Sequence, residues 1–244
     1  MKIIYPDIIE YEFILKEMCE GRNLFQLPFD CESVSGDLEE FEEDIMFLPT
    51  PLALKKTDRY VFLETGGIFS YFTGPSIVKT VRDFSKVYVR KGDHICYYYG
   101  TMLMKDMEFE VGEGEPSITE PARILEYYNP NTEKIDLYEK WGESSDYLPM
   151  PLYSGLLRND LVGIKDKVEK SILSSIRYSL HNFAFVLDEI YKEKQTSRPD
   201  ISKMIVLQYV NKRTMQMEEE EREAIRFLWK MMVENGYDIP EPRF

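Results

Sequence analysis

The sequence predicts an α/β protein with two lobes, mixed sheets and a helical carboxyl-terminal return. Three observations predict this class. Strand-like apolar runs alternate with helical patterns in residues 1–64, alternating strand-like segments follow in residues 76–147, and one long apolar stripe with helical spacing occupies residues 164–194. Strands separated by helices are typical of an α/β layer, in which helices cover a central sheet.

The first expected elements are a short buried strand over residues 1–5 and a helix from about Ile8 to Cys19. Asp7 is the expected N-cap of this helix, because Glu10 stands three residues later in the capping-box position. The next expected elements are a strand at residues 31–34, a short acidic helix beginning at Gly36 and Asp37, and strands at residues 45–47 and 60–64.

Two proline-flanked segments mark where the chain is expected to pass between the lobes, near residues 74–77 and near residues 147–151. Pro149 and Pro151 favour extended conformations in the residues before them, so the second passage should be a strand. The expected division places residues 1–75 and 150–244 in a discontinuous lobe one and residues 76–149 in a smaller, inserted lobe two. Lobe two should contain strands at residues 77–79, 86–89 and 108–111.

The carboxyl-terminal part of the sequence has three helical patterns. The apolar stripe from Ile164 to Lys194 predicts a single long helix, which needs a partner surface for its apolar side. A shorter helix should end at Tyr209, Val210 and Asn211. The acidic run at residues 218–221 should form the first turn of the last helix, where negative charge is favourable.

Composition excludes several classes of partner. A chain of 244 residues with 43% hydrophobic residues can bury a substantial core, and its formal net charge of −14 disfavours nucleic acid and anionic membranes as partners. The sequence has no apolar run of about 18 residues and no secretory signal pattern, so we expect a cytoplasmic location. Abundant Lys, Glu, Tyr and Ile suit a thermophilic source.

The three cysteines do not indicate a disulfide framework or a zinc site. Cys19, Cys31 and Cys96 are odd in number and widely spaced, so we expect reduced thiols and no metal. No cofactor is expected either, because Gly112 and Gly114 lack the third glycine and the following helix of a dinucleotide fingerprint.

The expected boundary between the lobes carries the candidate ligand-binding loops. Gly66 and Gly67 would let backbone N–H groups approach a carboxylate, and Thr65 and Ser76 would add hydroxyl donors. The alternative is that these glycines only turn the chain between strands. His94 can donate to an acid or act as a base, although a lone histidine more often has a structural role.

A proline-bracketed segment at residues 148–152, a turn at residues 158–161 and a helix end at residues 209–211 occur in a characteristic order. This order resembles the dihydroxynaphthoate synthase family of the futalosine menaquinone pathway, whose members cleave cyclic dehypoxanthinyl futalosine. Residues 44–50, 60–67 and 74–78 extend the resemblance upstream. It implies a type II periplasmic-binding fold with a ligand between the lobes. Combined with the loops above, the ligand-binding candidates are Asp7, Thr50, Thr65, Gly66, Gly67, Ser76, His94 and Thr119.

The sequence departs from that family at its catalytic positions. The family has a histidine where this chain has Thr119, and threonines where this chain has Ile95 and Cys96. Loss of a general base usually removes about two to four decades of rate. Glu120 and His94 are the remaining candidates for a base.

The sequence therefore favours a protein that binds a small acidic or aromatic metabolite between its lobes without the lyase activity of the family. Two alternatives stay open: a lyase of menaquinone biosynthesis with rearranged catalytic groups, and a non-catalytic interaction protein whose cleft has degenerated. Whether the protein is an enzyme and whether it forms a homodimer are also left open.

Overall fold

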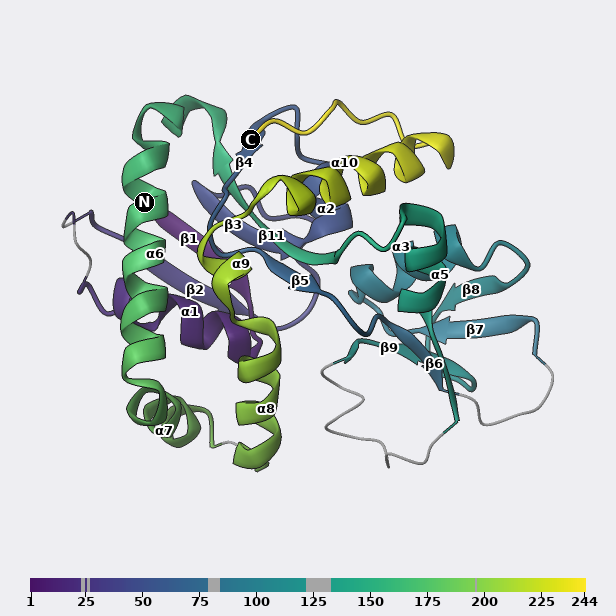
Figure 1. Cartoon of the computed structure of the whole chain (residues 1–244), viewed down its shortest axis with the longest axis horizontal. Coiled ribbons are helices and arrows are strands. Elements are labelled where there is room, and N and C mark those ends of the chain that lie inside the picture. The colour runs from purple at the N-terminus through teal and green to yellow at the C-terminus, as the bar shows by residue number, and fades with distance from the viewer. Residues whose placement is uncertain (23–24, 26, 79–83, 122–132, 196) are drawn as a thin grey trace.

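The computed structural model describes residues 1–22, 25, 27–78, 84–121, 133–195 and 197–244 (Figure 1). Two sheets lie side by side, and the chain passes between them more than once. We call the part built on the first sheet lobe one and the part built on the second sheet lobe two. The predicted α/β class with mixed sheets and a helical carboxyl-terminal return is confirmed.

The first sheet has six strands. Its path is β2 (Asp30–Val34), β1 (Lys2–Pro6), β3 (Ile45–Pro49), β11 (Met150–Arg158) and β4 (Tyr60–Phe62), and β5 (Ile68–Ser70) also pairs with β11. Strand β1 is parallel to β2 and β3, whereas β11 is antiparallel to β3, β4 and β5. The carboxyl ends of β1, β2 and β3 therefore meet at one edge of the sheet.

The second sheet has five strands in the order β10 (Lys134–Asp136), β6 (Ser76–Val78), β9 (Ser117–Thr119), β7 (Lys86–Val89) and β8 (Glu108–Val111). Strand β7 is parallel to β8 and β9, whereas β6 is antiparallel to β9 and β10. Helices α3 (His94–Leu103) and α5 (Leu137–Ser145) belong to this lobe and contact each other. Of the strand expected at residues 77–79, Lys79 lies outside the described residues.

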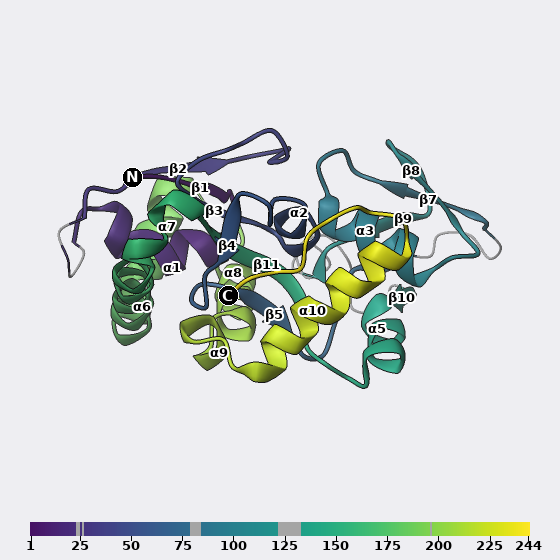
Figure 2. The ribbon, with the colours of Figure 1, turned by 90° about the horizontal axis from the view of Figure 1, so that it is seen from above.

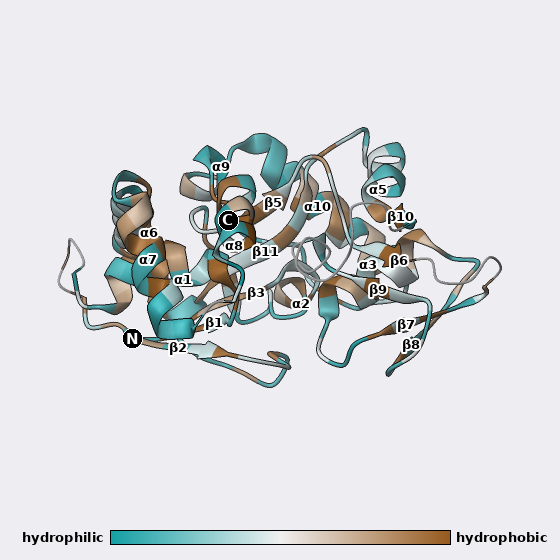
Figure 3. Ribbon diagram, turned by 90° about the horizontal axis from the view of Figure 1, so that it is seen from below, coloured by the Kyte–Doolittle hydropathy of each residue, from teal (hydrophilic) through white to brown (hydrophobic). Residues whose placement is uncertain are grey.

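The remaining helices form two groups. Helix α1 (Ile9–Cys19) packs against α6 (Lys165–His181), α7 (Phe183–Lys194) and α8 (Pro199–Tyr209), and the 3-10 helix η1 (Asn159–Ile164) leads into α6. Helix α2 (Thr50–Leu54) packs against β11 and α10 (Glu219–Glu234), and the short α9 (Lys212–Met215) precedes α10. Figure 3 shows hydrophobic residues on strands such as β5 and β6 and hydrophilic residues on α5 and α9.

Helix α10 reaches from lobe one to lobe two, as Figure 2 shows. The ring of Phe227 on α10 lies edge-on to the fully buried Trp141 of α5, with ring centroids 5.3 Å apart. Tyr237, which follows α10, lies 5.5 Å from Tyr98 of α3, measured between ring centroids. The carboxyl-terminal segment is therefore a third connection between the lobes, beside the β5–β6 link and β11.

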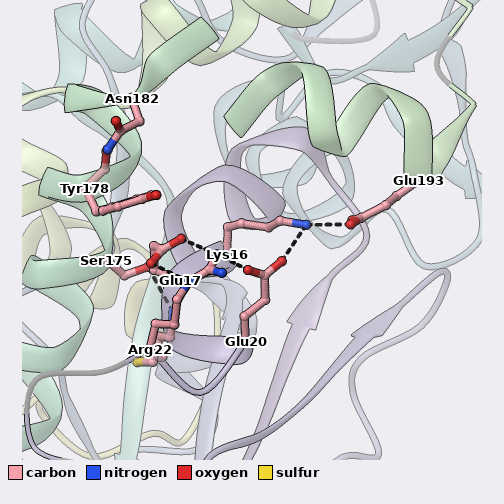
Figure 4. Close-up of polar contacts among 9 residues, drawn as sticks. Lys16, Glu17, Glu20, Arg22, Ser175, Tyr178, Asn182 and Glu193 are labelled. Carbon is pink, nitrogen blue, oxygen red and sulfur yellow. Dashed lines mark hydrogen bonds and ion pairs between the residues drawn. The ribbon is translucent and has the colours of Figure 1, made fainter. Parts of the chain in front are cut away.

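Polar contacts hold α1 against α6 and α7 (Figure 4). The Lys16 ammonium lies 2.7 Å from Glu193 of α7 and 2.8 Å from Glu20, and its side chain is only 7% exposed. Burial alone would lower the pKa of Lys16, but the hydrogen bonds to Glu193 and Glu20 outweigh it and raise the pKa. The Ser175 hydroxyl of α6 accepts a hydrogen bond from the Met18 backbone N–H.

The single long helix expected over residues 164–194 is wrong, because the chain leaves helical geometry at Asn182, which separates α6 from α7. The Asn182 side-chain amide donates to the carbonyl of Tyr178. Such side-chain bonds to the backbone compete with helix continuation. The apolar stripe nevertheless continues across the break, since Ile176 and Val186 are both fully buried.

Two predictions near the amino terminus are also wrong. Helix α1 has Ile8 as its N-cap, with no side-chain cap, because the Asp7 carboxylate instead accepts hydrogen bonds from Lys194 and Ser35. No helix forms at Gly36 and Asp37, where the described chain is irregular.

The expectation of three reduced thiols is wrong for two of them. Cys19 at the end of α1 and Cys31 in β2 form a disulfide, with Cα atoms 5.5 Å apart, and Cys96 is a buried free thiol. The parallel β1–α1–β2 crossover returns the chain to the start of β2 beside the end of α1, so residues 12 apart in sequence meet. Among the described residues, no helix is both long and apolar enough to cross a membrane.

Candidate functional site

The candidate site is a cavity of about 280 Å³ between the two lobes. It lies where the carboxyl ends of β1, β2 and β3 face the segments that follow β7 and β9. Ligands of open α/β sheets bind at such strand ends, because the loops and helix amino termini converge there. The cavity is lined by Pro6, Asp7, Ile8, Val34, Ser35, Gly36, Leu38, Pro49, Arg90, Lys91, Gly92, Asp93, Glu120 and Tyr153.

Both lobes contribute to the walls. From lobe one, the turn at residues 6–8 links β1 to α1, residues 34–36 end β2 and begin the next loop, and Pro49 ends β3. From lobe two, residues 90–93 link β7 to α3, and Glu120 follows β9. A ligand in this cavity would therefore contact both lobes at once.

The three acidic residues at the cavity already have hydrogen-bonding partners. The Asp7 carboxylate lies 2.7 Å from the Lys194 ammonium, and Asp93 accepts a hydrogen bond from the Cys96 backbone N–H at 3.0 Å. The Tyr153 hydroxyl donates to Glu120 at 2.8 Å. These bonds fix the orientation of the three carboxylates, and the Lys194 ammonium also offsets the charge of Asp7.

The pKa shifts follow from these contacts. Burial alone would raise the pKa of Asp7, but the hydrogen bonds from Lys194 and Ser35 outweigh it, so the pKa is lowered. Burial raises the pKa of Tyr153 well above its usual value, and the nearby Glu120 charge raises it further. Asp7 is therefore a stable anion and Tyr153 a stable neutral donor at neutral pH.

The basic residues of the cavity are not paired in this way. Arg90 and Lys91 are exposed, and within the described residues no ion pair joins either of them to a carboxylate. A cleft with fixed positive charge attracts anions, because its low-dielectric walls focus the field. Arg90 and Lys91 are therefore the groups in the lining that can attract an anion.

The amino terminus of α3 differs from the sequence expectation. Ile95 and Cys96, at the family's threonine positions, are buried and do not line the cavity. The Asp93 carboxylate is the N-cap of α3 and accepts a hydrogen bond from the Cys96 backbone N–H. Negative charge is thus already supplied at this helix end, and Arg90 and Lys91 are left as the groups that can hold an acid.

Of the predicted site residues, Asp7 and the base candidate Glu120 line the cavity, and His94 lines an adjacent one. Thr50 is buried and its hydroxyl lies 3.0 Å from the Ser154 hydroxyl. Thr119 lies in β9 opposite Ser76, and the Ser76 hydroxyl is fully buried and donates to the Gly74 carbonyl.

The structure places Thr65, Gly66 and Gly67 in the interior of lobe one, away from the cavity. Gly66 has a φ of +86°, and a Cβ atom there would lie 2.8 Å from the Phe47 ring. Its carbonyl accepts a hydrogen bond from the buried Tyr11 hydroxyl at 3.1 Å. Close packing and a left-handed turn therefore account for Gly66.

Sequence reasoning missed Ser35, Arg90, Lys91 and Tyr153. A signal existed for the basic pair: Arg90, Lys91 and Gly92 directly follow the predicted strand at residues 86–89, and a strand end is where ligand-binding loops begin. Ser35 and Tyr153 had no such signal, since each reaches the cavity through pairing of distant strands.

The adjacent cavity, also about 280 Å³ in volume, contains a group of potential metal ligands. Ligand atoms of Asp37, Glu39 and His94 lie within 4.8 Å of one another. The Lys55 ammonium bonds to Glu39, and the charge of Lys91 acts on Asp37. These cations disfavour a metal ion at the same place.

Residues 114–234 match a family described as menaquinone biosynthesis. No curated protein matches the chain. Among solved structures, a protein from Archaeoglobus fulgidus is similar, with a TM-score of 0.82 and 18% identity over 96% of this chain and 97% of that chain. An ABC transporter from Parabacteroides distasonis has a TM-score of 0.64 and 11% identity, covering 99% of this chain and 96% of that chain.

A Candida albicans protein, described as defining a new family with the generic periplasmic binding protein fold, has a TM-score of 0.60 and 11% identity over 98% of this chain and 92% of that chain. These structural likenesses confirm the expected periplasmic-binding-protein-like, two-lobed fold. The family match confirms the resemblance to menaquinone-biosynthesis proteins that the sequence indicated.

Proposed function

Starting from the menaquinone-biosynthesis match over residues 114–234 and the periplasmic-binding-protein-like fold, we propose that this protein binds a small organic acid between its lobes without cleaving it. The observation that carries the proposal is the pair of exposed cations, Arg90 and Lys91, that lines the cavity and forms no ion pair within the described residues.

The size and lining of the cavity support a small ligand with an apolar body. A volume of about 280 Å³ lies near the lower end of the usual range of ligand pockets. Ile8, Val34 and Leu38 in the lining offer apolar contact. An aromatic carboxylic acid with one ring has this combination of a flat apolar body and one negative charge.

The absence of lyase activity is supported by the position of Thr119. A threonine hydroxyl cannot act as a general base near neutral pH, and Thr119 does not line the cavity. One observation favours the alternative of a rearranged lyase: Glu120 lines the cavity, next to the position of the missing base, and is hydrogen-bonded to Tyr153. The open cavity disfavours the other alternative, a degenerate cleft filled by its own side chains.

A cytoplasmic location remains part of the proposal and rests on the biosynthetic family. The Cys19–Cys31 disulfide bears on it, because disulfides are rare in the cytoplasm outside hyperthermophiles. A thermophilic source, which the composition suits, would reconcile a cytoplasmic location with the disulfide, because cytoplasmic proteins of hyperthermophiles do contain disulfides. Fractionation of cells of the source organism would test this part directly.

The binding proposal is tested by titration calorimetry with benzoate and related aromatic acids. The double variant Arg90→Ala, Lys91→Ala should bind at least tenfold more weakly, because each charge-assisted hydrogen bond contributes about 1.5–3 kcal/mol. The matched control, Arg177→Ala with Lys203→Ala, removes two exposed cations on α6 and α8 and should bind like the wild type. Equal affinity of both double variants would refute the proposal.

A further inference from the structure

Two loops from different lobes meet beside the candidate site. Residues 34–38 follow β2 in lobe one, and residues 90–93 link β7 to α3 in lobe two. The two cavities of about 280 Å³ adjoin here, because both are lined by residues 90–93, while Gly36 lines the first and Asp37 lines the second. The meeting point is therefore a contact between the lobes in the wall of the ligand cavity.

This contact is made by backbone atoms. Gly92 has a φ of +81°, and a Cβ atom placed on it would lie 3.3 Å from the Asp37 backbone nitrogen and 3.4 Å from the Gly36 carbonyl carbon. A backbone atom cannot rotate out of the way as the end of a side chain can, so a side chain at position 92 would displace one of the two loops. Glycine at this position therefore allows a closer approach of the lobes than a larger residue would.

A hydrogen bond between the lobes accompanies the backbone contact. His94 Nε2 lies 2.8 Å from Asp37 Oδ1, and the His94 side chain is only 13% exposed. The Glu39 backbone N–H donates to the same Asp37 oxygen at 3.0 Å, so lobe one fixes the orientation of this carboxylate. The two loops are therefore tied together beside the point where their backbones touch.

The loop of lobe two also carries the cations of the candidate site. The Asp93 backbone N–H donates to the Arg90 carbonyl at 3.0 Å, which closes a turn around Lys91 and Gly92. Both cations are exposed, and the turn joins them directly to the contact. The distance of Arg90 and Lys91 from lobe one therefore depends on how closely Gly92 approaches residues 36–37.

We propose that the contact of Gly92 with Gly36 and Asp37 is the stop that sets how far the lobes close, and that it positions Arg90 and Lys91 for the acid. This inference rests on the proposed function, since it assigns a positioning residue to the same site. Lobe one supplies the apolar side chains of the lining and lobe two supplies the cations. An acid can contact both only while the lobes are this close.

The test replaces Gly92 by asparagine, which tolerates a positive φ but has a side chain for which the contact leaves no room. The matched control is Gly21→Asn, because Gly21 has a φ of +77° and a Cβ atom there would meet nothing within 4 Å. Titration calorimetry measures the binding of benzoate. Pulsed electron paramagnetic resonance measures the distance between the lobes, with spin labels at Lys192→Cys of α7 and Glu113→Cys of lobe two, both exposed positions.

Gly92→Asn should bind benzoate at least about tenfold more weakly, which corresponds to the loss of one charge-assisted hydrogen bond. The distance between its spin labels should be longer than in the wild type, because the lobes cannot close fully. Gly21→Asn should match the wild type in both measurements. Thermal unfolding of each variant confirms that it is folded during the measurements.

Unchanged affinity or an unchanged distance in Gly92→Asn overturns the stop, and benzoate binding by the wild type then leaves the proposed function standing. Failure of the wild type to bind benzoate and related aromatic acids refutes the proposed function instead. In that case the distance decides the stop: a longer distance in Gly92→Asn supports it, and an unchanged one overturns it. If Gly92→Asn does not fold, Gly92→Ala takes its place, with a smaller change expected in the same direction because it adds only the Cβ atom.

Discussion

Removal of the Cys19–Cys31 disulfide should destabilise the protein by an amount that its sequence spacing predicts. The bond joins the end of α1 to β2 across 12 residues. Closing a loop of this length in the unfolded chain removes conformational entropy worth about 3 kcal/mol at 25 °C. For a chain of 244 residues, each kcal/mol shifts the melting temperature by about 2–4 °C, so Cys19→Ser should lower it by about 6–12 °C.

Thermal unfolding followed by circular dichroism, with and without a phosphine reductant, checks this prediction. The reductant should lower the melting temperature of the wild type and leave Cys19→Ser and Cys31→Ser unchanged. Cys96→Ala serves as the control, because Cys96 is the free thiol and its variant should keep the sensitivity to reductant. A wild-type melting temperature that reductant does not change, together with three titratable thiols in the unreduced, unfolded protein, would refute the reasoning.

Three further predictions concern single positions. Gly66→Ala should destabilise the protein by about 2 kcal/mol or more in urea unfolding, because a φ of +86° and the Phe47 ring both oppose a Cβ atom; unchanged stability would contradict this. Because the pKa of Asp7 is lowered in the folded protein, its carboxylate stabilises the fold at pH values above its unfolded pKa of about 3.9. This stabilisation is lost as the pH falls through the folded pKa. Asp7→Asn should therefore lose less stability than the wild type below about pH 4. Purified protein should not cleave cyclic dehypoxanthinyl futalosine, since Thr119 cannot supply a base; turnover near the typical median of about ten per second would make Glu120 the catalytic base instead.

The strands were largely predictable from the sequence, because their apolar runs are short and bounded by turn residues. The predicted strands at residues 31–34, 45–47 and 86–89 each correspond to a strand of the structure. Periodicity alone could not detect the break at Asn182, since the apolar stripe has the same phase in α6 and α7. Nor could spacing show that Cys19 and Cys31 meet, because this depends on the return of the chain from α1 to β2.

The site was less predictable than the fold. Asp7 follows the first strand and lines the cavity. Gly66 and Gly67 have the composition of a ligand loop, yet they serve packing against Phe47 and Phe69. Paired glycines indicate that another group approaches the backbone closely. The sequence alone does not tell whether this group is a ligand or a side chain of the protein's own core.

The carboxyl-terminal helix α10 has a consequence for how a ligand enters and leaves. Two-lobed binding proteins open by rotating one lobe about the segments that join it to the other. Here Phe227 and Tyr237 of the carboxyl-terminal segment pack against Trp141 and Tyr98 of lobe two, so a wide rotation would have to separate these aromatic contacts. Ligand exchange should therefore be slow and the empty cleft already close to its bound shape, which reduces the ordering cost of binding.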